Sequence, residues 1–123
     1  MERMDRVGQA YIRFALECPH QFHLLAFPPE GAPALDRVEA LVREQVGKVA
    51  SLIREGIAEG SLRPDIDADR TAMVVWRMFD GVLSLAHRPD GLRAGPHEMV
   101  TLLTIMGELL NAALQVSSDR AVR

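Results

Sequence analysis

Residues 96–116 read PHEMVTLLTIMGELLNAALQV, and this stretch decides the fold. Its polar residues recur at steps of three and four, so they share one stripe, about 80° wide, of an α-helix. This stripe comprises Thr101, Thr104, Glu108, Asn111 and Gln115. The remaining circumference is apolar, which exceeds what a helix needs to cover one core. The stretch therefore predicts a helix that contacts partners on two sides.

The helix expected before it, from the N-cap candidate Asp67 to about His87, is similarly apolar around most of its circumference. Pairing these two helices with the same two helices of a second chain gives a four-helix bundle with twofold symmetry. The expected homodimer interface comprises Val74, Met78, Val82, Leu85, Leu102, Met106, Leu109, Leu110 and Ala113. In the alternative, the earlier helices cover this surface and the chain is a monomer.

Three earlier helices are expected at about 3–17, 19–26 and 34–59, where apolar residues follow helical spacing between prolines. Gly60 is a candidate left-handed cap for the third helix. No segment alternates apolar and polar residues with a period of two. The fold class is therefore all-α, with five helices in one domain over 1–116, and the polar tail 117–123 is expected to be frayed.

The composition excludes several classes of protein. Fourteen basic and seventeen acidic residues give a net charge of −3, which does not supply the basic patch needed to bind nucleic acid directly. The N-terminus lacks the apolar run of a signal peptide, and the longest apolar stretch is too short to span a membrane. A single cysteine, Cys18, cannot form an intrachain disulfide, so we expect a cytoplasmic protein.

Two motifs carry a resemblance to a known family. Residues 8–19, GQAYIRFALECP, followed by Phe22, and residues 55–67, EGIAEGSLRPDID, resemble the effector domains of tetracycline-repressor-type transcription regulators. One subgroup of that family carries a Trp-three-residues-His-Gly signature, to which Trp76 and Gly81 correspond. Asp80 stands where the histidine would be, so no role is carried over from that histidine.

The resemblance implies a homodimer built on the last two helices, with a pocket among the earlier helices and the fourth that binds a small apolar or aromatic effector. In such regulators an N-terminal helix-turn-helix domain reads the operator. Nothing before Glu2 corresponds to that domain, so we expect the chain to lack it. The expected function is effector binding and dimerisation that modulates DNA binding by a full-length regulator. The alternative is a dimerisation module that forms heterodimers without a ligand.

The expected ligand-binding residues combine aromatic walls with a few polar groups, which suits a flat apolar ligand. They are Tyr11, Phe14, Phe22, Val46, Trp76, Phe79, Asp80 and Leu83. Ordinary core packing is the alternative explanation for each aromatic residue.

Other chemistry finds little support in the sequence. Glu17, Cys18, His20 and His23 lie close together, but Pro19 interrupts their helix face and no second cluster accompanies them, so no metal site is expected. Cys18 with a histidine could form the nucleophile and base of a catalytic site, but neither a third group that orients the histidine nor an oxyanion motif accompanies them. We therefore expect neither an enzyme nor a cofactor.

Overall fold

The computed structural model describes residues 2–31 and 34–116, and within these ranges the regular elements are helices. They are α1 (Glu2–Glu17), α2 (Pro19–Ala26), α3 (Leu35–Glu59), α4 (Ala68–Ser84), the short 3-10 helix η1 (Leu85–His87) and α5 (Pro96–Leu114). The prediction of an all-α fold with five helices is confirmed. The tail predicted at 117–123 lies outside the described residues.

The helix ends follow from local chemistry. The Asp67 carboxylate accepts a hydrogen bond from the Arg70 backbone N–H at 3.1 Å, which caps the start of α4 as predicted. Gly60 ends α3 with a left-handed φ of 84°, a conformation that glycine adopts without steric penalty. α4 ends at Ser84, three residues before the predicted end, because the backbone tightens into η1 over the last turn.

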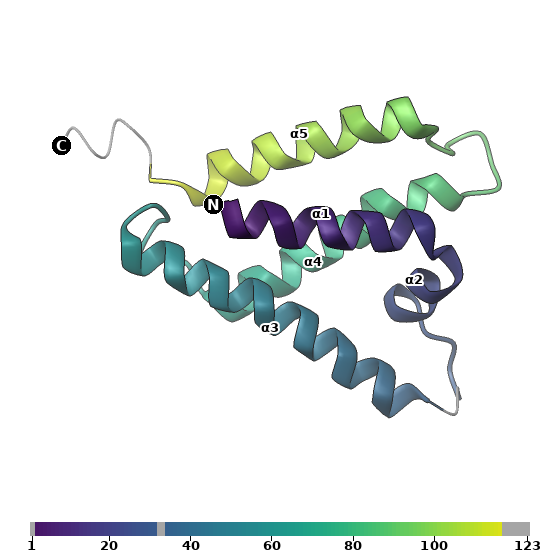
Figure 1. Ribbon diagram of the computed structural model, residues 1–123, viewed down its shortest axis with the longest axis horizontal. Helices are drawn as coiled ribbons and strands as arrows, with labels where there is room; N and C mark the ends of the chain where they lie inside the picture. Colours follow the sequence, from purple (N-terminus) through teal and green to yellow (C-terminus); the bar gives the residue numbers. More distant parts are fainter. Residues whose placement is uncertain (1, 32–33, 117–123) are drawn as a thin grey trace.

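Figure 1 shows α1 crossing in front of α4, with α3 on one side of this pair and α5 on the other. The most extensive helix contact joins α3 and α4. The far end of α5 is tied to the loop after α3, since Arg63 N–H donates to the Leu114 carbonyl at 3.0 Å. This bond fixes the end of α5 relative to the loop after α3. α5 makes fewer contacts with α4 than α3 does.

The core consists of two clusters of buried side chains. The first joins α1, α2, the end of α4 and the start of α5; its buried members are Ala15, Phe22, Ala26, Leu83, Ala94 and Met99. The second joins α3 to α4 and Leu62; its buried members are Val46, Ala50, Ile53, Leu62, Ala72 and Trp76. Tyr11 of α1 packs against both. The space between the two clusters is where the candidate site lies.

In the part of the chain that is described, no helix is both long and apolar enough to cross a membrane.

Candidate ligand cavity

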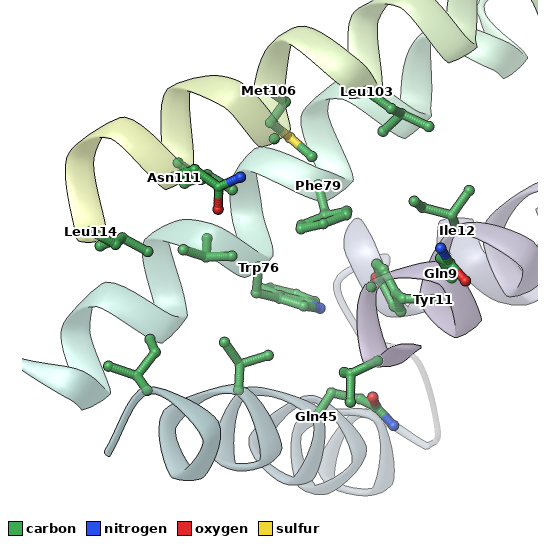
Figure 2. A pocket seen from close by; sticks show the side chains of 17 residues that line it. Gln9, Tyr11, Ile12, Gln45, Trp76, Phe79, Leu103, Met106, Asn111 and Leu114 are labelled. Atoms are coloured by element: carbon green, nitrogen blue, oxygen red, sulfur yellow. The ribbon is translucent and has the colours of Figure 1, made fainter. Parts of the chain in front are cut away.

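A cavity of about 230 Å³ lies between α1, α3, α4 and α5. Figure 2 shows side chains from all four helices converging on it, with Trp76 near its centre. Seventeen residues line it: Val7, Gly8, Gln9, Tyr11, Ile12, Gln45, Val49, Ile53, Val75, Trp76, Phe79, Leu103, Met106, Gly107, Leu110, Asn111 and Leu114. The volume exceeds the roughly 150 Å³ that accommodates a benzene molecule in an apolar protein cavity.

The lining is apolar and carries no charged side chain. Its polar groups are the amides of Gln9, Gln45 and Asn111, the Tyr11 hydroxyl and the Trp76 indole N–H. None of these groups titrates near neutral pH, and none is an activated nucleophile. The arrangement suits binding of an apolar molecule held by few hydrogen bonds.

α1 and α4 meet at the cavity edge, where Gly8 faces Phe79. A Cβ atom on Gly8 would lie 3.4 Å from Phe79 Cζ, which is an ordinary van der Waals contact. Phe79 itself lines the cavity. The α1 backbone at Gly8 therefore packs directly against a side chain of the cavity wall.

Trp76 is buried, with 8% of its surface exposed, and lines the cavity. Its indole Nε1 is covered from solvent and has no hydrogen-bond partner within bonding geometry. The nitrogen-bearing edge of the indole is turned towards Tyr11 (Figure 2), and the N–H lies close enough to act on the Tyr11 hydroxyl, lowering its pKa against the larger effect of burial. Leaving such a donor unpaired costs about 1–3 kcal/mol.

Asp80 lies behind Tyr11 and is fully buried. The Tyr11 hydroxyl donates to its Oδ1 at 2.5 Å, and the Arg77 guanidinium donates to its Oδ2 at 3.4 Å. Burial raises the pKa of Asp80 to about 6, although both bonds and the Arg77 charge lower it. Burial, followed by the bond to Asp80, raises the pKa of Tyr11. This network ties α1 to α4 next to the cavity.

Arg77 extends the network to the end of α2. Its Nη1 donates to the Ala26 carbonyl at 2.7 Å, which satisfies a backbone group at a helix terminus. The guanidinium also lies 5.1 Å from the Phe27 ring centroid and 5.4 Å from that of Trp76. One side chain thus contacts α2, the buried acid and the back of the cavity tryptophan.

The structure brings together three of the eight residues expected to bind ligand, namely Tyr11, Trp76 and Phe79. Val46 lies in the second core cluster, whereas Phe22 and Leu83 are buried in the first. Phe14 packs against that first cluster. Asp80 stands behind Tyr11 and outside the lining. For these five residues, packing within the chain accounts for their positions.

Sequence reasoning missed the amides of Gln9, Gln45 and Asn111 and the contribution of α5 to the lining. Asn111 belongs to the polar stripe of α5, to which no ligand-binding role was assigned. The sequence signal for such a lining residue is a polar side chain next to the apolar face of a helix, because a residue at this border can reach the mouth of a cavity.

The residues expected at the dimer interface divide into two groups. Val74 and Leu109 are 59% and 61% exposed, Ala113 is also exposed and Met78 is partly exposed. The others face their own chain: Val82, Leu85 and Leu102 pack against the first core cluster, Met106 is buried, and Leu110 lines the cavity. Ile105, at 48% exposed, joins the outward group although it was not among the expected residues.

The residues expected not to form a metal site run from the end of α1, at Glu17, to the last turn of α2, at His23. His20 and His23 are both exposed. No group of three or more histidine, cysteine or acidic side chains that could hold a metal ion occurs among residues 2–31 and 34–116.

Comparison with known proteins gives one finding. Residues 4–106 match the family model described as "Tetracyclin repressor-like, C-terminal domain". Neither the curated proteins nor the solved structures yielded a match. The matched range contains α2, α3 and α4 in full, most of α1 and the first part of α5, and the cavity residues Gly107, Leu110, Asn111 and Leu114 lie beyond it.

Proposed function

Because the chain belongs to the tetracyclin repressor-like C-terminal domains, we propose that it binds a small apolar effector in the cavity and forms a homodimer through α4 and α5. In a complete regulator, these two properties together would control DNA binding by a separate DNA-reading domain. The observation that carries the proposal is the uncharged, mainly apolar cavity of about 230 Å³, which lies between four helices and is partly open to solvent.

The cavity supports effector binding because its empty volume lies at the junction of two otherwise filled core clusters. The pocket is partly open to solvent, so an apolar ligand that fills it would remove apolar lining from water and add dispersion contacts. A module that served dimerisation alone has no use for a partly open apolar pocket of this size. The cavity therefore favours an effector-binding domain over the alternative of a plain dimerisation module.

The outer faces of α4 and α5 support dimerisation. Val74 on α4 and Ile105 and Leu109 on α5 expose 48–61% of their surfaces, as apolar side chains on two long helices. Exposed apolar side chains mark interaction sites where they gather on one surface. A twofold pairing of both helices would cover it in both copies.

α5 connects the two properties. Met106 and Leu110 face the cavity, while Ile105 and Leu109 lie on the exposed side of the same helical turns. An effector that binds better to one position of α5 would shift the population towards that position. The geometry of the dimer, and with it the spacing of attached DNA-reading domains, would then depend on the effector.

Native mass spectrometry of the purified chain tests the proposal. We expect a species of twice the 13.6 kDa chain mass that carries a co-purified small molecule or takes up added apolar compounds. A dimer that takes up no small molecule would contradict effector binding and support the dimerisation module. A bare monomer would contradict both parts of the proposal.

A further inference from the structure

The chemistry of the cavity limits the class of effector, and this inference rests on the proposed function. We propose that the effector is a neutral molecule of about ten non-hydrogen atoms whose one essential polar group is a hydrogen-bond acceptor, such as a carbonyl oxygen, that accepts from the Trp76 indole N–H. The size follows from a volume of about 230 Å³, compared with roughly 150 Å³ for a cavity that holds benzene.

Neutrality follows from the lining. All seventeen lining residues are uncharged, so a charged effector would lose its hydration without gaining a counter-ion. The buried charges nearby already have partners, because Asp80 accepts from both Tyr11 and Arg77. Desolvating an unpaired ion costs far more than a single hydrogen bond returns.

The need for an acceptor follows from Trp76. Among the described residues, its Nε1 is the buried side-chain polar atom that lacks a hydrogen-bond partner. The Tyr11 hydroxyl is close, but its proton is committed to Asp80 and its oxygen does not meet the indole N–H in bonding geometry. An acceptor on the effector would remove the penalty of this unpaired donor.

The placement of the indole makes this contact reachable. Trp76 lies across the cavity with its nitrogen-bearing edge turned towards Tyr11, and both rings belong to the lining (Figure 2). In this structure the N–H is covered, so the acceptor reaches it only when the indole or the Tyr11 ring shifts enough to open this atom to the cavity. An acceptor at that position would be fixed at one end of the cavity, while the apolar part of the effector extends towards Met106 and Leu110.

The test compares two ligands that differ in one atom: cyclohexyl ethyl ketone, and the alkene in which a methylene group replaces its oxygen. Trp76 is the chain's one tryptophan, so a ¹H–¹⁵N spectrum contains a single indole N–H signal that reports this donor directly. Neither ligand has an aromatic ring, so ring currents from the ligand do not shift that signal. Titrations of wild type give the Kd of each ligand.

Two variants separate the hydrogen bond from the hydrophobic difference between the ligands. Trp76→Phe removes the N–H and keeps an aromatic ring, whereas Phe79→Leu alters the cavity wall and keeps the N–H. Because the ketone loses the same hydration in every case, the ratio of ketone to alkene Kd isolates the contribution of the indole. We expect this ratio to favour the ketone about tenfold more in wild type and Phe79→Leu than in Trp76→Phe.

We also expect the indole proton signal of wild type to move downfield with the ketone and not with the alkene. If both ligands bind, with the same Kd ratio in all three proteins and no downfield shift, the assignment of the acceptor to Trp76 is wrong while effector binding stands. If neither ligand binds to wild type, both the inference and the proposed effector binding are contradicted.

Discussion

At the scale of single residues, Asp80 sets a pH dependence on stability. Burial raises its pKa from 3.8 to about 6, so the folded state holds a proton on this carboxyl more tightly than the unfolded state does. Its contribution to the free energy of unfolding is therefore fully present below about pH 4 and is lost as the pH rises through about 6. This pKa shift corresponds to at most about 3 kcal/mol of the free energy of unfolding.

Asp80→Asn should remove this pH dependence, because an amide stays neutral and still accepts from the Tyr11 hydroxyl. We compare the free energy of unfolding of the variant with that of wild type at each pH. We expect the variant to be about 1–3 kcal/mol more stable relative to wild type at pH 7 than at pH 4. Urea denaturation followed by circular dichroism at both pH values measures it. Asp69→Asn, an exposed carboxylate on the same helix, is the control and should show no such gain. An identical difference at both pH values for Asp80→Asn would refute the assignment.

At the scale of helices, periodicity predicted all five elements, and local chemistry predicted the Asp67 cap and the Gly60 cap. The faces of those helices were harder to assign. Met106 and Leu110 were expected at a dimer interface, yet they lie towards the cavity, each one position after the outward Ile105 and Leu109. Spacing along one helix shows that two apolar flanks exist. Which flank meets the chain's own core depends on tertiary packing, which a single sequence does not reveal.

The cavity itself was less predictable than the fold. Aromatic residues were expected around a ligand because of their type, but Phe22 is packed within the first core cluster and has 1% of its surface exposed. Trp76 and Phe79 line empty space. Whether an aromatic side chain fills a core or borders a cavity depends on the volumes of its neighbours across several helices. The combined volume of these neighbours is a property of the packed structure, and the sequence around one aromatic residue does not reveal it.

The C-terminal turn of α3 provides a test of close packing at the element scale. A Cβ atom on Gly56 would lie 2.6 Å from Leu62 Cδ1, and Leu62 is fully buried and has little room to move. We expect Gly56→Ala to lower the free energy of unfolding by about 1–3 kcal/mol, because overpacking outweighs the gain in helix propensity. Chemical denaturation measures the change.

Gly47→Ala on the same helix is the matched control. Nothing lies within 4 Å of a Cβ atom at this exposed position, so the substitution brings the propensity gain without a clash. We expect it to raise the free energy of unfolding by about 0.5–1 kcal/mol. Equal effects of the two substitutions would show that Leu62 does not restrict position 56.

At the scale of the whole molecule, α5 has exposed apolar residues on two opposite sides. Val100 and Leu109 are 65% and 61% exposed, and nine residues at about 100° each place them half a turn apart. Leu109 shares its side with Ile105, whereas Val100 lies beside the polar stripe at Thr104 and Asn111. A dimer that pairs α4 and α5 with their copies would cover Leu109 and leave Val100 in solvent.

This difference allows a test of the proposed interface with two variants of the same chemistry. Leu109→Glu would place a carboxylate and its symmetry mate in an apolar contact, and we expect the dimer Kd to rise by a hundredfold or more, about 3 kcal/mol. Val100→Glu adds the same charge to an equally exposed position and should leave the Kd within about twofold. Sedimentation equilibrium over a range of concentrations measures both, and circular dichroism confirms that each variant is folded. A dimer weakened by Val100→Glu but not by Leu109→Glu would move the interface to the other side of α5, and with it the coupling between cavity and dimer.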